Sequence, residues 1–163
     1  MHNLIKTLES IDHSKILEYY ESIKNSIIWE NFTKCKQSSL QHKHNQNVWT
    51  SGTGPGDGTD LEYKQLNSFY ENSIFEKLIQ KFNLYRTRLM LVEPWSCYSM
   101  HCDTSPRIHI PIITNPNSYF VFKEGLIQHL PTGYAYWVDT MKTHTFMNCS
   151  REYRVHLMGS VKE

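Results

Sequence analysis

The sequence has no long hydrophobic run and no strong excess of charge of either sign. No apolar stretch approaches the roughly 20 residues that a membrane helix needs. The opening segment, MHNLIKTLES, is too rich in polar residues to hold the apolar region of a signal peptide. Seventeen Lys and Arg residues against sixteen Asp and Glu residues give a net charge of +1, which removes the usual argument for a dedicated nucleic-acid binder. We therefore expect a cytoplasmic protein with no membrane or nucleic-acid partner.

Little in the sequence suggests disulfides, repeats or an alternating α/β fold. The four cysteines form no CxxC pair and show no repeated spacing, and without an export signal they are expected to be reduced thiols. No segment repeats, and strand and helix patterns do not alternate, which disfavours a doubly wound sheet. With 163 residues and 39% hydrophobic residues, the chain is long enough to bury one sizeable core. We expect a single domain over residues 1–163.

The N-terminal 85 residues are expected to be mainly helical. Apolar residues at helical spacing predict helices over about 13–26 and 72–83. Between them, residues 34–47 are polar, and residues 51–58 (SGTGPGDG) contain four glycines and a proline. Because such segments lack the apolar area that offsets the entropy of ordering, both are predicted to be loops. For the Gly-rich loop, a surface connection is favoured over a lid beside a site.

From Arg86 onward the hydrophobic period changes from helical to two, which is typical of strands. The predicted strands are 87–92, 107–113, 118–122, 126–130, 134–138, 143–148 and 153–160. About seven short strands in one block after two helices favour a β-sandwich or a jelly roll.

The sharpest motif in this block is His101-Cys102-Asp103. Alternate residues of an extended segment point to the same side, so His101 and Asp103 can bind one ion together. The motif alone carries little weight in a chain with nine histidines. However, His144 lies on a later predicted strand, and two imidazoles with one carboxylate form the facial triad that suits non-haem Fe(II). Such a triad leaves three metal positions for a bidentate cosubstrate and O₂.

Arg154 lies ten residues beyond His144, on the last predicted strand. If its neighbours Tyr153, Val155 and Leu157 pack outside, Arg154 points into the interior, where a buried guanidinium requires an anionic partner. The forked donors of an arginine can grip the far end of a dicarboxylate. A protein carboxylate is the alternative partner, and it would make Arg154 purely structural.

A longer pattern surrounds these residues. In order, it comprises Glu93-Pro94 seven residues before His101, His101-x-Asp103, Arg107-Ile108-His109-Ile110-Pro111, Gly133-x-x-x-Trp137-Val138-Asp139 five residues before His144, Asn148, and Tyr153-Arg154-Val155-His156-Leu157. With this order and spacing, residues 89–161 resemble the aspartyl/asparaginyl β-hydroxylase branch of the 2-oxoglutarate- and Fe(II)-dependent oxygenases.

The resemblance implies a mainly β double-stranded β-helix (a cupin-like jelly roll), with the N-terminal helices packed on it. Residues 86–163 would form the β-helix core that carries the metal site. The implied metal ligands are His101, Asp103 and His144. Arg154 would bind the far carboxylate of 2-oxoglutarate, and His109 would lie near its metal-side carboxylate. His109 has an alternative reading as a satisfied histidine that faces the barrel interior.

Two features depart from the family pattern. The animal enzymes of this branch lack the carboxylate ligand, whereas Asp103 is present here. The residue that helps the arginine to hold the cosubstrate is often a hydroxyl on the preceding strand, but residues 88–92 read RLMLV. The arginines Arg86, Arg88 and Arg107 are interpreted as solvated or paired with Asp or Glu.

The leading interpretation is an Fe(II)- and 2-oxoglutarate-dependent hydroxylase. Its substrate would be an amino-acid or peptide side chain of the Asp, Asn or Pro type, or a small metabolite. Succinate and CO₂ would be the products of the cosubstrate, and no catalytic group is expected beyond the metal centre. The alternative is a cupin-like metal-binding protein, or a metal-dependent enzyme that does not use 2-oxoglutarate. The sequence does not indicate an oligomeric state.

Overall fold

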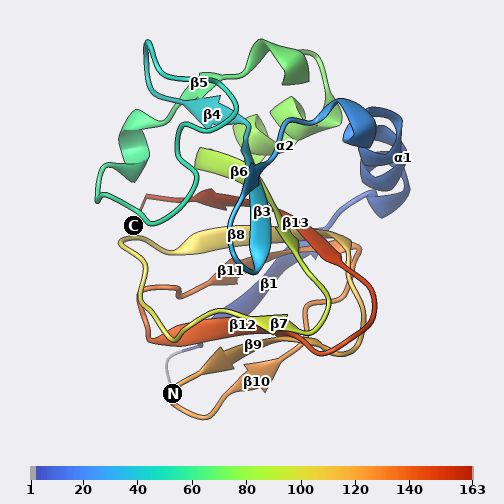
Figure 1. Cartoon of the computed structure of the whole chain (residues 1–163), viewed down its shortest axis with the longest axis vertical. Helices are drawn as coiled ribbons and strands as arrows, with labels where there is room; N and C mark the ends of the chain where they lie inside the picture. Colours follow the sequence, from blue (N-terminus) through green and yellow to red (C-terminus); the bar gives the residue numbers. More distant parts are fainter. Residues whose placement is uncertain (1–2, 163) are drawn as a thin grey trace.

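The computed structural model describes residues 3–162, so residues 1, 2 and 163 of the expected domain lie outside it. Most of the regular structure is antiparallel β-sheet (Figure 1). The larger sheet has the order β1-β11-β8-β13-β6-β3-β2 and the smaller one β10-β9-β12-β7, while β4 and β5 form a separate pair.

The strands of the larger sheet are β1 (Ile5–Ser10), β2 (Glu30–Asn31), β3 (Cys35–Ser39), β6 (Tyr85–Val92), β8 (Arg107–Ile113), β11 (Tyr134–Val138) and β13 (Arg154–Ser160). The smaller sheet contains β7 (Ser96–Cys97), β9 (Ser118–Phe122), β10 (Ile127–Gln128) and β12 (His144–Asn148), and the separate pair is β4 (Gln41–His42) and β5 (Gln65–Leu66). The helices are α1 (His13–Ile23) and α2 (Ile74–Phe82), with short 3₁₀ turns η1 (Lys24–Ser26), η2 (Asp60–Glu62) and η3 (Ser68–Tyr70).

Both predicted helices form, and their first turns are capped by side chains. Asp12 accepts a hydrogen bond from the backbone N–H of Lys15, and Ser73 accepts one from that of Glu76. Helix α2 ends at Phe82, and the capping residue Asn83 adopts a left-handed conformation with φ of 49°. Helix α2 is therefore capped at both ends.

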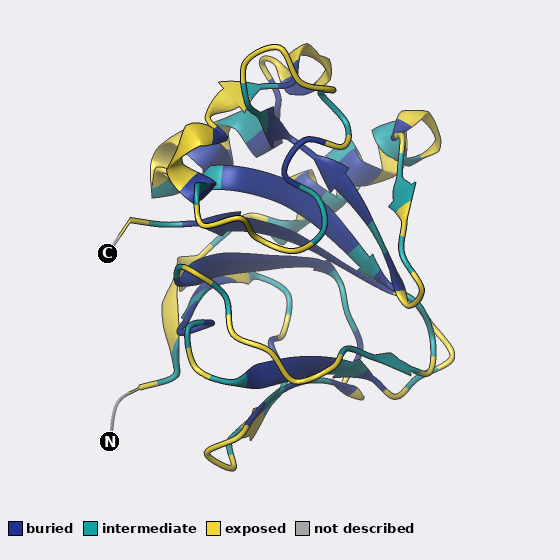
Figure 2. Cartoon of the chain, turned by 60° about the vertical axis from the view of Figure 1, so that its left-hand side comes forward, coloured by how far each residue is buried: buried dark blue, intermediate teal, exposed yellow. Residues whose placement is uncertain are grey.

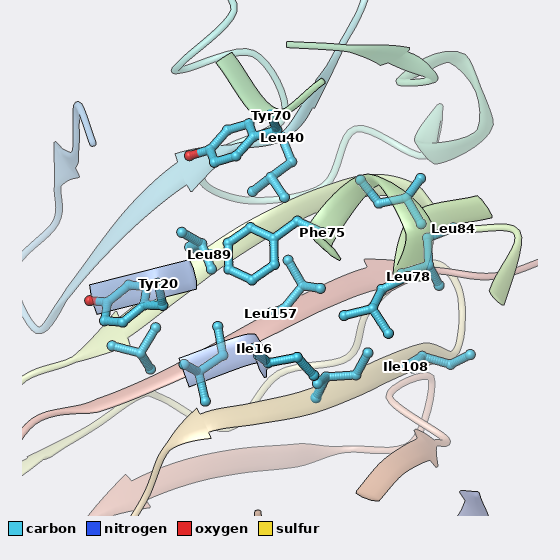
Figure 3. Packing of buried hydrophobic residues seen from close by; sticks show 14 of the residues in the cluster. Ile16, Tyr20, Leu40, Tyr70, Phe75, Leu78, Leu84, Leu89, Ile108 and Leu157 are labelled. Carbon is cyan, nitrogen blue, oxygen red and sulfur yellow. The ribbon is translucent and has the colours of Figure 1, made fainter. Parts of the chain in front are cut away.

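The helices lie on one side of the larger sheet, and the smaller sheet lies on the other (Figure 1). Ile16 and Phe75 from the helices pack against Ile108 and Leu157 of the sheet (Figure 3). All seven residues of β13 are buried because both faces of this central strand are covered (Figure 2). The expected jelly roll with N-terminal helices packed on it is confirmed.

Alternate residues of the central strands serve different purposes. On β8 and β13, the residues that face the helices are aliphatic, such as Ile110 and Leu157. On the opposite face, Arg107 and His109 of β8 and Arg154 and Met158 of β13 point into the interior between the two sheets. The same two strands therefore build the hydrophobic core on one face and line a polar interior on the other.

The prediction of a loop over residues 34–47 is wrong in its first part. Residues 35–39 form β3, which pairs with β6 in the larger sheet. Its sequence, CKQSS, has no apolar alternation because its buried side chains include Gln37, Ser38 and Ser39. The first 85 residues also supply β1, whose pairing with β11 leaves most of its side chains exposed at the sheet edge. The predicted strand 126–130 is regular only over Ile127–Gln128.

Within residues 3–162, none of the helices has the length and apolar character required to cross a membrane. All four cysteines are free thiols, as expected for a chain without disulfides.

Candidate metal centre

The residues of the predicted triad come together at one end of the interior. His101 and His144 form an isolated antiparallel bridge in which each backbone N–H donates to the other carbonyl at 2.9 Å. The backbone N–H of Asp103 donates to the carbonyl of Thr140 at 2.8 Å, which holds the aspartate of the motif beside the segment that leads into β12. One ligand atom from each of His101, Asp103 and His144 lies within 4.8 Å of the others. The three side chains form a group that could hold a metal ion.

Backbone carbonyls orient both imidazoles. Nδ1 of His101 lies 2.9 Å from the carbonyl oxygen of Ser99, and Nδ1 of His144 lies 2.8 Å from that of Lys142. Because a carbonyl only accepts, each Nδ1 carries the proton and each Nε2 keeps its lone pair for a metal. Burial lowers the pKa of His144, which favours the neutral form that binds metals.

The third ligand candidate is held by an arginine. Asp103 forms an ion pair with Arg107 at 2.9 Å, and Nε2 of His144 lies 3.9 Å from the other oxygen of this carboxylate. Arg107 also lies 3.9 Å from Asp60. Asp103 therefore has one oxygen against a fixed cation and the other directed toward the histidines.

Asp60 is a buried carboxylate that connects this centre to distant parts of the chain. It accepts hydrogen bonds from Ser105 at 2.7 Å and Ser160 at 2.6 Å, and it pairs with Arg86 at 3.2 Å. Burial alone would raise the pKa of Asp60, but the two serines and the arginines Arg107 and Arg86 lower it overall. This network was not predicted from the sequence, because its members lie as many as 100 residues apart.

The triad opens into a cavity of about 670 Å³ between the two sheets. His109 and Arg154, the two residues predicted to bind the cosubstrate, line the same cavity. Aromatic side chains, including Phe120 and Phe146, complete its wall. The structure thus brings all five predicted site residues to one cavity.

Arg154 is buried without an acidic partner. Its guanidinium carbon lies 3.6 Å from the centroid of the Phe146 ring, and one of its nitrogens donates to Nδ1 of His156. Within residues 3–162 no carboxylate forms an ion pair with it, and its Nε has no hydrogen-bond partner. Burial lowers its pKa to about 9. The structure therefore contradicts the alternative in which a protein carboxylate neutralises Arg154.

Tyr98 is a site residue that the sequence analysis missed. It lines the cavity, and its buried hydroxyl has no hydrogen-bond partner in the described part of the chain. Burial raises the pKa of Tyr98 well above its ordinary value, and Arg154 is close enough to lower it in part. One tyrosine among ten carries no signal by itself, and only the fold brings this hydroxyl near the arginine.

His109 also has unused hydrogen-bonding groups. Neither ring nitrogen has a partner among the described residues, and its ring lies 4.9 Å from that of Phe120. Burial, together with the positive charge of Arg154, lowers the pKa of His109 well below its ordinary value. A neutral, buried imidazole without partners is uncommon in folded proteins. It does not fit the alternative of a histidine satisfied by the protein.

The Gly-rich loop lies at this cavity, so its reading as a plain surface connection is wrong. Gly54, Pro55 and Gly56 line the cavity wall. Arg86 donates to the carbonyls of Gly52 at 2.9 Å and Gly54 at 3.0 Å, which fixes the loop to β6. A Cβ atom on Gly56 would lie 2.9 Å from Nη1 of this arginine, so a larger residue there would displace the end of the Arg86 side chain.

Comparisons with known proteins support the fold. No family model matches the chain, and no curated protein matches it. A 2OG-Fe(II) oxygenase family oxidoreductase from Burkholderia pseudomallei aligns with 96% of this chain and 84% of its own, at 10% identity and a TM-score of 0.59. A prolyl-4-hydroxylase from Pseudomonas putida aligns with 98% of this chain and 92% of its own, at 8% identity and a TM-score of 0.58. The chain shares their fold.

A cupin domain from Bordetella pertussis covers 47% of this chain and 80% of its own, at 19% identity and a TM-score of 0.42, and this partial match carries no further weight. Identities this low establish the arrangement of strands and nothing finer. The resemblance to the aspartyl/asparaginyl branch therefore remains a prediction from the sequence.

Proposed function

We propose that this protein is an Fe(II)- and 2-oxoglutarate-dependent oxygenase that hydroxylates an unactivated C–H bond. The observation that carries the proposal is one cavity that contains both a His-Asp-His group and a buried arginine without an acidic partner. A metal-binding role alone explains the first feature but gives no use for the second. The fold shared with 2-oxoglutarate oxygenases supports the same function.

The donor set fits Fe(II). His101, Asp103 and His144 would hold the ion through two imidazole nitrogens and one carboxylate oxygen, which leaves three coordination positions open. Bound Fe(II), with 2-oxoglutarate and O₂, would supply an oxidation that yields succinate, CO₂ and a hydroxylated product. The ion pair with Arg107 would hold the carboxylate of Asp103 in its orientation toward the metal.

The orphaned polar groups of the cavity fit a dicarboxylate cosubstrate. Arg154 would grip the far carboxylate of 2-oxoglutarate with its guanidinium, and the hydroxyl of Tyr98 would donate a second hydrogen bond. His109 would lie near the metal-side carboxylate. Phe120 and Phe146 would exclude water, which strengthens each of these polar contacts.

The substrate would be an amino-acid or peptide side chain of the Asp, Asn or Pro type, or a small metabolite. The Gly-rich loop and the N-terminal strand β3 border the cavity and would contact the substrate. The protein supplies ligands, orientation and shelter, and the iron with its cosubstrate supplies the chemistry.

Anaerobic titration of Fe(II)-loaded protein with 2-oxoglutarate tests the proposal. The weak visible metal-to-ligand charge-transfer band should develop in the wild type and in His44→Ala, whose side chain is exposed and away from the cavity. His144→Ala should not develop it. Succinate should then form when air is admitted. A tightly bound metal with no band and no succinate would instead support the cupin-like metal protein.

A further inference from the structure

Arg154 is not the only buried arginine of the cavity without an acidic partner. Arg86 pairs with Asp60, and Arg107 pairs with Asp103 and lies near Asp60. Arg88 on β6 forms no ion pair with any carboxylate of residues 3–162, although only 4% of it is exposed. The expectation that this arginine is solvated or paired is therefore wrong.

The strand register separates Arg88 from Arg154. Arg88 lies opposite Met158, whereas Arg154 lies opposite Val92, four positions along the same β6–β13 ladder. An even spacing keeps both arginines on the face that lines the cavity. At about 3.3 Å per residue, their backbone positions are roughly 13 Å apart. The side chains of Arg88 and Arg154 therefore enter the cavity from well-separated positions on its wall.

The contacts of Arg88 leave part of its guanidinium unused. Its Nη1 donates to the carbonyl of Gly52, whereas its buried Nε has no partner among the described residues. Burial and the positive charges of Arg107 and Arg86 lower its pKa well below the ordinary value. Arg86 donates to the same carbonyl and to that of Gly54, so without Arg88 the loop would keep two side-chain hydrogen bonds from β6.

The charge of the cavity wall exceeds what one cosubstrate neutralises. The wall contains the basic side chains Lys34, Arg88, Arg107 and Arg154 and one carboxylate, Asp103. A bound divalent metal would add two positive charges, and 2-oxoglutarate would bring two negative ones. The cavity would therefore still carry a net positive charge with the metal and 2-oxoglutarate bound. Arg88 contributes to this charge, and it is buried and has no acidic partner among the described residues. This imbalance favours a second anion in the same cavity.

We propose that Arg88 binds a carboxylate of the prime substrate, which is therefore an anionic molecule that enters beside the Gly-rich loop. Met90, the next residue on the same face of β6, and Met158, the cross-strand neighbour, flank the arginine and also line the cavity. Flexible methionine side chains suit an apolar body of variable shape. The substrate class is a carboxylate with an apolar portion directed toward the metal. This inference rests on the proposed oxygenase function.

Matched pairs of probes test the charge requirement. Protein loaded with Mn(II) and 2-oxoglutarate is titrated with linear and phenyl-substituted monocarboxylates of three to nine carbons and with the amide of each. Line broadening of the probe protons by Mn(II) reports binding near the metal. The carboxylates should bind to the wild type and their amides should not. In Arg88→Met, carboxylate affinity should fall about thirty-fold or more, because the buried charge pair is lost.

The affinity for 2-oxoglutarate, measured on the same samples, separates this inference from the proposed function. Arg88→Met should leave it unchanged, whereas the matched variant Arg154→Met should lose it. Wild-type protein that binds the metal but not 2-oxoglutarate would contradict the proposed function alone, since the probe pairs can still be compared on metal-loaded protein. Loss of 2-oxoglutarate in Arg88→Met would make Arg88 a cosubstrate anchor and overturn the inference.

Two further outcomes also decide against Arg88. In the first, the wild type binds carboxylates and amides equally well. In the second, carboxylates bind to Arg88→Met as tightly as to the wild type. Either result would show that Arg88 contacts the Gly-rich loop and does not bind the substrate. Circular dichroism establishes that each variant is folded. If Arg88→Met does not fold, Arg88→Lys replaces it: the ammonium should keep part of the carboxylate preference and lose the forked contact, and an undiminished affinity would contradict the proposal.

Discussion

His101 and His144 are joined by two backbone hydrogen bonds of 2.9 Å, although 42 residues separate them in the sequence. The bridge fixes the relative positions of the two imidazoles through the main chain. Nδ1 of each ring contacts a carbonyl two residues before it, so side-chain rotation is restrained as well. The two nitrogen donors are therefore positioned by the fold before any ion binds.

This preorganisation predicts the behaviour of metal-ligand variants. His144→Ala and Asp103→Asn should bind Fe(II) or Mn(II) at least about a hundredfold more weakly, yet remain folded, because the backbone bridge does not require the metal. Isothermal titration with Mn(II) measures the affinity. In a metal-bound crystal structure, the three donors should lie roughly 2.0–2.2 Å from one ion. An ion bound elsewhere, or side chains that face different sides of the sheet, would refute the triad.

Tyr98 should contribute to cosubstrate binding and not to metal binding. Tyr98→Phe removes one buried hydroxyl that has no protein partner, so 2-oxoglutarate affinity should fall by up to about tenfold, the value of one ordinary hydrogen bond. Competition titration on Mn(II)-loaded protein measures this change. Tyr136→Phe is a suitable control, since its hydroxyl donates to Pro131 and not to the cavity. Equal affinities in Tyr98→Phe and the wild type would remove Tyr98 from the site.

Asp60 should contribute strongly to stability. Asp60→Asn leaves two buried arginines without their shared carboxylate, so the free energy of unfolding should fall by about 3–5 kcal/mol. Asp57→Asn, at a half-exposed aspartate paired with Lys43, should cost less than about 1 kcal/mol. Urea unfolding compares the two variants. Similar losses in both would contradict the central position of Asp60.

The same carboxylate predicts a pH dependence. The folded-state pKa of Asp60 is lowered, so its stabilisation is complete above its unfolded value of about 4 and disappears as the pH falls through the folded value. Urea unfolding at a series of pH values from neutral to acidic should therefore show a steeper loss of stability in the wild type than in Asp60→Asn. Parallel curves for the two proteins would show that Asp60 is not preferentially ionised in the folded state.

Hydrogen exchange in the Gly-rich loop should change on ligand binding in one part of the loop and not in another. The amide of Gly54 donates to Gln37, so it should be protected from hydrogen exchange even in the free protein. The segment 55–58 borders the cavity or follows directly after it, and its exchange should slow when substrate binds. Hydrogen-exchange mass spectrometry with and without ligand measures both. Equal protection over 55–58 in the two states would leave the loop as a fixed wall.

The sequence predicts the second half of the fold well because its strands are short runs rich in β-branched and aromatic residues, and several are separated by Pro, Asn and Gly. Strands β8, β9 and β11 have the predicted bounds. Strand β3 escapes prediction because its side chains are mostly polar and several face other polar groups, so buried positions carry no hydrophobic signal. Strand β1 escapes because an exposed edge strand needs no apolar face.

Some residues of the candidate site could likewise be predicted from the sequence, and others could not. The triad is recognisable because His101 and Asp103 form a local motif and the pattern around His144 supports it. The partners of Asp60 come from three distant segments, and no local rule relates them. Whether Arg88 has a carboxylate partner likewise depends on tertiary packing, so the sequence alone favoured the commoner paired or solvated arrangement.

The affinity of Fe(II)-loaded, folded Arg154→Ala protein for 2-oxoglutarate is the most direct test of the oxygenase account. Loss of the buried guanidinium should weaken binding by about 2–5 kcal/mol, or roughly thirty- to several-thousand-fold, while metal affinity stays nearly unchanged. Arg154→Lys should recover only part of the loss, because an ammonium cannot reproduce the planar fork. Wild-type affinity for 2-oxoglutarate in Arg154→Ala would contradict the account, since the cosubstrate would then be held by a different group.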